Sequence, residues 1–166
     1  MRSGRSISTT MIDQSELRPG DVLLYAPSGI FGWAIAWMTS GGVSHVEVYK
    51  GGGVSYASRD GLGTEEYPLR KEQLVRVLRS RESLNMGRMA QAFSNMRGQP
   101  YDWKGIINTA TGGQGDSSPK GNVCSAAATI WLRVAGMARL FGAEEPEHIT
   151  PRDFEKSDLF WQVWSA

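Results

Sequence analysis

The sequence has little cysteine, little histidine and little net charge, and each shortage excludes a class of protein. It contains one cysteine and two histidines among 166 residues. A single cysteine excludes an internal disulfide, so the fold does not depend on an oxidising compartment. The formal net charge is +1 at pH 7, which gives no reason to expect nucleic acid or an anionic membrane surface as a partner.

The chain also lacks long hydrophobic runs. The apolar stretch over residues 30–38 is only about half as long as a membrane span requires. Residues 1–14 contain two arginines but not the apolar segment of a secretion signal. We therefore expect no integral membrane segment and synthesis in the cytoplasm, with release by lysis or by a signal-independent route left open.

Several common ligand-binding motifs are absent too. One cysteine and two distant histidines give no recognisable zinc spacing. The glycine runs match neither a phosphate-binding loop nor a dinucleotide fingerprint, and there is no nucleophile elbow built on serine. We expect no cofactor and no metal.

The length of the chain predicts one domain. Residues 1–14 are polar and predict a flexible arm, followed by a single domain over residues 15–166. Alternation and apolar runs indicate strands over residues 22–25, 43–49, 54–58 and 74–78. Helices are indicated over residues 30–39 and 86–96, from Cys124 to about Ala135, and from Thr150 onward.

The single cysteine, Cys124, stands between a glycine-rich loop over residues 111–121 and an alanine-rich helical pattern. A thiol in the first turn of a helix lies near unpaired N–H groups and the positive end of the helix dipole, which favours the thiolate. A free cysteine is more often a small buried hydrophobic residue. A nucleophilic role therefore requires a histidine within reach.

Of the two histidines, His45 is the candidate. His148 follows an acidic run over residues 144–147, where a surface position is expected. His45 lies in the alternating segment 43–49 and shares a face with Glu47, ~6–7 Å away along the strand. An ionisable pair on a buried face is costly unless it has a use, whereas on an outer face Glu47 is only a solvated charge. The alternation leaves open which face is buried, because Val46 and Val48 lie on the other.

Five segments, taken in order, resemble NlpC-type papain-like cysteine hydrolases. Residues 18–25 resemble the Gly-Asp strand of that family, and residues 44–49 with their glycine hairpin resemble its His strand. Residues 98–103 resemble its Gly-x-Pro-Tyr segment, residues 123–125 its Cys-Ser helix start, and residues 149–157 the Ser/Thr-Pro helix of YiiX-like chains. Because the histidine precedes the cysteine, the order is that of the circularly permuted branch, which includes YiiX-like proteins and the lecithin retinol acyltransferase-like group.

The resemblance implies an α+β, permuted papain-like fold, with an antiparallel, partly barrel-like sheet and the Cys124 helix packed against it. It implies Cys124 as nucleophile and His45 as general base. It also implies a third polar residue about a dozen positions after the histidine. Counting forward reaches Tyr56, Ala57 and Ser58, where relatives often carry Glu or His, so this chain departs from the family pattern there.

The departure leaves two ways to orient the imidazole. Either Glu47 does so from the same strand, or Tyr56 or Ser58 does so from the next one. We favour Glu47, because a carboxylate also stabilises the imidazolium that forms during catalysis. Tyr101 is expected to help shape the cleft near the thiol.

Three functions are compatible with these residues. The first is a thiol hydrolase that uses Cys124 and His45 to cleave an amide bond, including those of cell-wall-type peptides, through an acyl-thioester. The second keeps the same pair but acts on an acyl ester or thioester, or transfers the acyl group, with the apolar run over residues 30–38 lining the acyl site. The third is a non-catalytic binding module, which the departure at residues 56–58 favours. The expected partner is thus a peptide or an acyl-type substrate.

Overall fold

The computed structural model describes residues 11–27, 42–59, 62–98 and 123–166. In these residues the chain forms strands, α-helices and the short 3-10 helices η1 (Gln14–Glu16), η2 (Lys71–Gln73) and η3 (Pro146–His148). The helix expected over residues 30–39, the glycine-rich loop over residues 111–121 and Tyr101 lie outside the described residues.

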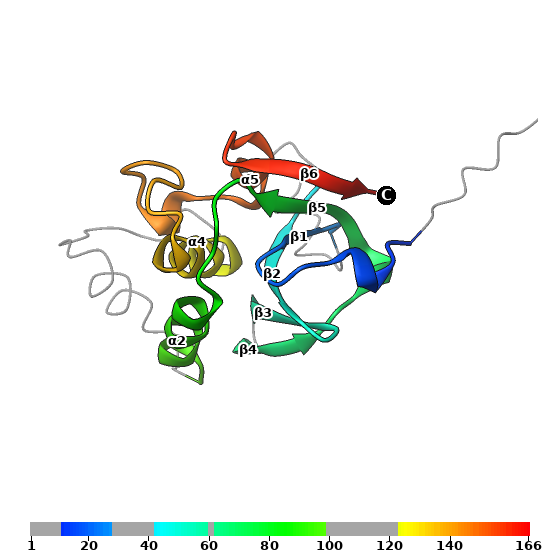
Figure 1. The fold of residues 1–166 in the computed structure, drawn as a ribbon, viewed down its shortest axis with the longest axis horizontal. Coiled ribbons are helices and arrows are strands. Elements are labelled where there is room, and N and C mark those ends of the chain that lie inside the picture. Colours follow the sequence, from blue (N-terminus) through cyan, green and yellow to red (C-terminus); the bar gives the residue numbers. More distant parts are fainter. Residues whose placement is uncertain (1–10, 28–41, 60–61, 99–122) are drawn as a thin grey trace, which may run out of the picture.

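The strands form one antiparallel sheet. They are β1 (Val22–Tyr25), β2 (His45–Gly51), β3 (Val54–Arg59), β4 (Gly63–Pro68), β5 (Leu74–Ser80) and β6 (Phe160–Ser165). Their order across the sheet is β4-β3-β2-β1-β5-β6, with β4 and β6 at the edges, and the sheet curves along this order (Figure 1). An antiparallel sheet combined with helices confirms the α+β class, and in the described residues the sheet is open.

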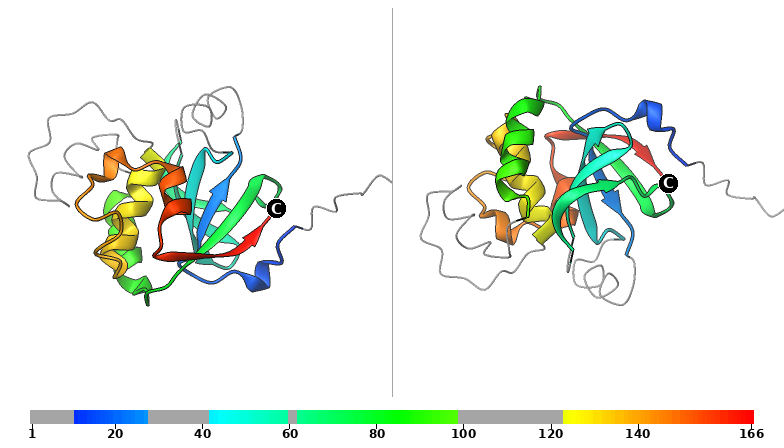
Figure 2. Two further views of the ribbon diagram at one scale, coloured as in Figure 1. Left: turned by 90° about the horizontal axis from the view of Figure 1, so that it is seen from above. Right: turned by 90° about the horizontal axis from the view of Figure 1, so that it is seen from below.

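Helices α2 (Met86–Met96) and α4 (Val123–Ala135) lie side by side on one face of the sheet (Figures 1 and 2). Helix α2 starts after Asn85, whose side chain accepts a hydrogen bond from the N–H of Arg88, and it turns Met89 and Phe93 toward the core. Helix α4 packs against both β2 and β3. The expected placement of the Cys124 helix against the sheet is therefore present.

The C-terminal segment joins the helices to the far edge of the sheet. Helix α5 (Pro151–Lys156) starts with a capping box formed by Thr150 and Asp153. Glu155 of α5 accepts a hydrogen bond from Arg76 of β5. The ring of Phe154 lies 6.1 Å from the ring of Phe160 in β6, centroid to centroid.

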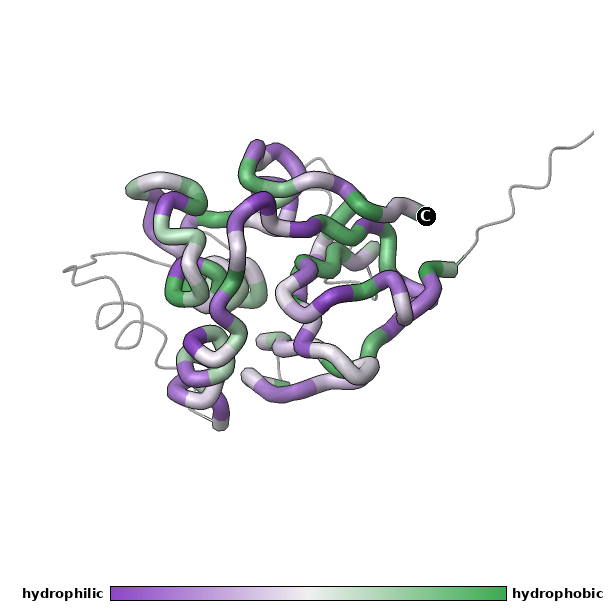
Figure 3. The backbone as a smooth tube through the Cα atoms, viewed as in Figure 1, coloured by the Kyte–Doolittle hydropathy of each residue, from purple (hydrophilic) through white to green (hydrophobic). Residues whose placement is uncertain are grey.

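Both faces of the sheet carry buried residues, because β1 is apolar at every position and β2 is buried at consecutive positions. Figure 3 shows hydrophobic residues spread among hydrophilic ones along the backbone. The cluster under the helices takes Val22, Leu24, Val46, Val48 and Tyr56 from the sheet. The cluster on the opposite face contains Ile12, Leu17, Leu23, Tyr25, Tyr49, Leu74 and Val77. Both faces of β1 and β2 are thus covered, and His45 and Glu47 belong to the second face.

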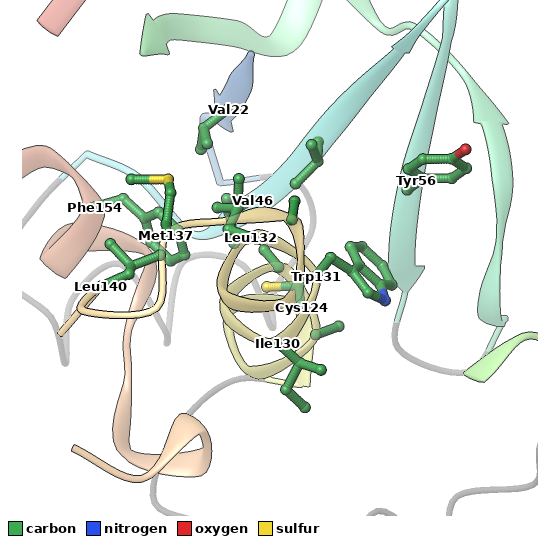
Figure 4. Packing of buried hydrophobic residues seen from close by; sticks show 14 of the residues in the cluster. Val22, Val46, Tyr56, Cys124, Ile130, Trp131, Leu132, Met137, Leu140 and Phe154 are labelled. Atoms are coloured by element: carbon green, nitrogen blue, oxygen red, sulfur yellow. The ribbon is translucent and has the colours of Figure 1, made fainter. Parts of the chain in front are cut away.

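The helix-facing core is centred on Trp131 of α4, which is fully buried (Figure 4). Its ring lies 5.6 Å from that of Phe93 in α2 and 6.1 Å from that of Tyr56 in β3, both edge-on. Tyr56 and Phe93 stack on each other at 4.2 Å. Aromatic pairs at these separations add to the stabilisation from burial, so one side chain connects both helices to the sheet.

A glycine hairpin returns the chain from β2 to β3. Residues 51–53 are all glycine, with φ of +115°, +62° and +79°. Residues with a Cβ rarely adopt this left-handed region, so the turn depends on glycine. The hairpin places β3 beside β2 and brings Ser55 and Arg59 next to Glu47.

Some boundaries differ from the expectations. The strand over 22–25 and the helix over 86–96 have the expected bounds, whereas β4 and β6 were not expected. Ile12, inside the arm expected over residues 1–14, is buried against the second-face cluster. Val43, inside the strand expected over residues 43–49, precedes the observed strand and joins the helix-facing cluster.

Candidate active site

His45 and Glu47 form a contact along β2. They occupy alternate positions of an extended strand, so their side chains leave the same face. The distance from His45 Nε2 to Glu47 Oε1 is 3.0 Å. The His45 side chain is 18% exposed and the Glu47 side chain is fully buried. The pair expected from the alternation is therefore present, and it is set into the protein.

The carboxylate of Glu47 is surrounded by hydrogen-bond donors from other elements. Ser55 of β3 donates its hydroxyl to Oε2. Arg59 of β3 donates to Oε1 from Nε at 3.0 Å and from Nη2 at 2.8 Å. Arg70, which precedes η2, donates to the same oxygen from Nη2 at 3.2 Å. A buried charge is stable only when it is paired and hydrogen-bonded, and these donors meet that condition.

Cys124 belongs to the helix-facing core, on the other side of the sheet from Glu47, and it interacts with His45 at the first residue of β2. It is the second residue of α4, within the first turn, where backbone N–H groups have no intrahelical acceptor. The next residue fixes this end of the helix, because the Ser125 hydroxyl donates to the carbonyl of Ile149. Cys124 is 1% exposed, in the core shown in Figure 4, and its interaction with His45 raises the pKa of that imidazole.

Charges around the imidazole determine its protonation. Burial alone lowers the pKa of His45, but the interactions with Cys124 and with Glu47 outweigh it and raise that pKa to about 9. Burial likewise raises the pKa of Glu47, and the hydrogen bonds and charges of His45, Ser55 and Arg59 lower it to about 2. Glu47 is therefore a carboxylate and His45 an imidazolium at neutral pH.

Tyr25 closes the site on the β1 side. It pairs with His45 across the β1–β2 ladder, and the two ring centroids lie 6.0 Å apart. Burial and the charge of Glu47 raise the pKa of the Tyr25 phenol. The phenol therefore stays neutral.

The other candidate orienting residues lie elsewhere. Tyr56 stacks on Phe93 under the helices, and the Ser58 hydroxyl accepts a hydrogen bond from Thr64. Both residues occupy alternate positions of β3 on the helix-facing side. Ala57, between them, shares the face of Glu47 and carries no polar group. Of the three residues weighed for orienting His45, Glu47 is the one in contact with it.

Three residues around the Glu47 carboxylate were not predicted from the sequence: Ser55, Arg59 and Arg70. For the two residues of β3 a signal existed, because they follow the same two-residue alternation and the hairpin pairs β3 with β2. An arginine in line with a buried carboxylate is a natural partner for it. Arg70 follows β4, which was not expected as a strand, so its approach had no sequence signal.

The second histidine, His148, is separate from this site. His148 forms an ion pair with Glu144, with 3.6 Å between Nδ1 and Oε1. Both line an open depression of about 610 Å³ near α5, together with Phe141, Asp153 and Lys156. His45, Glu47 and Cys124 are not among its lining residues.

Within the described ranges, no three His, Cys, Asp or Glu side chains are grouped as metal ligands. The same part of the chain contains no helix with the length and apolar character to cross a membrane. No protein-family model matches this chain, and no curated protein matches it. The fold and the site thus define an α+β protein in which a histidine contacts a buried glutamate and interacts with a cysteine.

Proposed function

We propose that this protein is a cysteine hydrolase that cleaves an amide bond in a peptide substrate, such as a cell-wall-type peptide. One observation carries the proposal: the imidazole of His45 interacts both with the Cys124 thiol and with the Glu47 carboxylate. This is the order of groups that an activated nucleophile requires, with a base beside it and an orienting group beyond the base. Nε2 faces Glu47, so Nδ1 is the nitrogen left for the thiol.

The reaction uses these groups in sequence. The sulfur of Cys124 attacks the carbonyl carbon, and the thiol proton resides on His45. The tetrahedral oxyanion accepts a hydrogen bond from the backbone N–H of Cys124, in the first turn of α4. His45 then gives its proton to the departing amine as the C–N bond breaks, which leaves an acyl-thioester. A water molecule, deprotonated by His45, attacks the thioester, and the acid product and the free thiol are released.

Glu47 remains ionised throughout this cycle. With a pKa of about 2, it does not take the proton from the imidazolium. It instead fixes the ring orientation and stabilises the positive charge that His45 carries. We therefore expect Glu47→Gln to leave a weakened enzyme, whereas Cys124→Ala removes the nucleophile.

Turnover assays test the proposal directly. The full chain is incubated with short peptides of cell-wall type and, in parallel, with acyl-thioesters. We expect amide cleavage by the wild type and by His148→Ala, and none by Cys124→Ala or His45→Ala. Turnover of the thioester without any amide would assign the same pair to ester or acyl-transfer chemistry and would overturn the amidase proposal.

The burial of Cys124 favours a second function, a binding module in which this residue only fills the core. Its side chain is 1% exposed, as is common for structural cysteines. Mass spectrometry after exposure to an activated acyl donor separates the two functions. A hydrolase gains an acyl group on Cys124 that Cys124→Ala does not gain, whereas a binding module gains none.

A further inference from the structure

The carboxylate of Glu47 faces more positive groups than one negative charge can neutralise. Its Oε1 receives two hydrogen bonds from Arg59 and one from Arg70, and it lies 3.0 Å from Nε2 of His45. The side chain is fully buried, so water does not screen these interactions. A carboxylate that only oriented an imidazole would need neither arginine.

Both guanidinium groups are held in place by aromatic rings. The Cζ atom of Arg59 lies 4.0 Å from the centre of the Tyr67 ring, and that of Arg70 lies 4.8 Å from the centre of the Tyr25 ring. These distances are within the range of cation–π contacts. The arginines come from β3 and from the segment between β4 and η2, so donors from separate elements converge on one oxygen of a residue in β2.

The two arginines are not equivalent. Arg59 makes two hydrogen bonds through its planar fork, and its side chain is 15% exposed. Arg70 makes one longer hydrogen bond, and its side chain is 30% exposed. Paired, charge-assisted hydrogen bonds in a buried setting are the stronger kind. Arg59 therefore binds the Glu47 carboxylate more strongly than Arg70 does.

We propose that Arg59, assisted by Arg70, is a positioning residue of this site. It fixes the Glu47 carboxylate against His45, and its positive charge offsets part of the negative charge that acts on the imidazole. The inference rests on the proposed function, because it treats Glu47 as the group that orients His45. The arginines act on Glu47, and Glu47 acts on the imidazole.

The sign of one measurable change follows from this role. Among the residues that the structure describes, the titratable and charged groups around His45 and its carboxylate partner are Tyr25 on β1, Glu47 on β2, Arg59 on β3, Arg70 before η2 and Cys124 on α4. Removing Arg59 takes away a positive charge and leaves the carboxylate free to bond more strongly to the imidazole, and both changes raise the pKa of His45. Loss of a merely structural brace would let the carboxylate turn away, which would lower that pKa.

Nuclear magnetic resonance titration of the histidine ring protons in the full chain measures this change. The chain has two histidines, so His148→Ala assigns the signals. We expect Arg59→Gln to raise the titration midpoint of His45 by on the order of one pH unit. Arg70→Gln should raise it less. Arg97→Gln is the matched control, because it removes an exposed arginine paired with Glu65, and it should leave the midpoint unchanged.

A double variant tests whether Arg59 acts through the carboxylate. In a Glu47→Gln background, adding Arg59→Gln should raise the His45 midpoint less than it does in the wild type, because only the loss of the arginine's own charge then remains. Arg59→Lys keeps the charge without the fork and should give an intermediate midpoint, which also provides a test if Arg59→Gln does not fold. An unchanged or lowered midpoint in Arg59→Gln, or an equal shift in the Glu47→Gln background, would overturn the proposal. The titration needs no substrate, so its result is separate from that of the turnover assays.

Discussion

At the scale of single residues, Glu47 is the position where sequence and geometry agree best. The two-residue alternation predicted its contact with His45, and the contact is present at 3.0 Å. The alternation did not indicate which face of β2 is buried. In the structure both faces of this strand are buried. Sequence reasoning that assigns one solvent face to a strand cannot anticipate that.

The pKa of His45 makes the stability of the protein depend on pH. The folded-state pKa of His45, about 9, lies above the ordinary value of 6.5, so protonated His45 stabilises the folded state. This contribution is complete below about pH 6.5 and is lost as pH rises through about 9. At roughly 1.4 kcal/mol per pH unit, we expect the free energy of unfolding to fall by on the order of 3 kcal/mol over this window. Urea unfolding at several pH values measures it.

Glu47 gives the opposite dependence in acid. Its folded-state pKa, about 2, lies below the ordinary 4.5, so its contribution to stability is present above about pH 4.5 and is lost as pH falls through about 2.

His45→Ala should flatten the decline in stability at alkaline pH, and His148→Ala should not. The same alkaline decline in His45→Ala and in the wild type would contradict this assignment.

At the scale of elements, segments with strong periodicity were predictable and edge strands were not. Helix α2 has methionines and a phenylalanine at helical spacing between Asn85 and Gly98, and it was predicted with its observed bounds. Strand β4 contains two glutamates and a proline, so it lacks the composition of a buried strand, whereas β6 has the aromatic and branched residues of a strand but is mostly exposed. Both become strands because a neighbouring strand pairs with them.

The turn into β1 depends on a buried ion pair. The carboxylate of Asp21 is almost fully buried and accepts hydrogen bonds at 2.8 Å from Nε and Nη2 of Arg79, which lies in β5. It also accepts one from the N–H of Arg18. Removing one partner leaves a charge unpaired, so we expect Asp21→Asn to lower the free energy of unfolding by about 3 kcal/mol. Urea unfolding at pH 7 checks this value.

An exposed ion pair of the same type is the control. Glu65 and Arg97 form two hydrogen bonds on the surface between β4 and α2. Solvent screens that pair, so Glu65→Gln should leave the unfolding midpoint unchanged. Equal effects of the Asp21 and Glu65 substitutions would contradict the importance given to burial.

At the scale of the whole molecule, the site exists because two layers meet. His45 and Glu47 belong to the sheet, and Cys124 belongs to the helix packed on it, so their contact depends on how the layers pack. A resemblance in the order of short segments predicted that packing for Cys124 and His45. It did not predict the arginines, because their approach depends on the hairpin and on the path of the chain after β4.

Trp131 holds the two layers together, and its removal should weaken the whole molecule. It is fully buried between α2 and β3, so Trp131→Ala should lower the free energy of unfolding by about 3–5 kcal/mol. Trp161→Ala, at a position that is 50% exposed on β6, should change it by less than about 1 kcal/mol. Circular dichroism during urea unfolding measures both, and equal losses for the two variants would contradict this view of the core.

The rate at which iodoacetamide alkylates Cys124 at pH 7 tests most directly whether folding turns this buried sulfur into a nucleophile. The chain has no other thiol, so all incorporated label reports on this one atom. We expect alkylation faster than that of free cysteine, slowed strongly by His45→Ala and unaffected by His148→Ala. A thiol that reacts no faster than free cysteine, at the same rate with and without His45, would contradict the enzyme assignment.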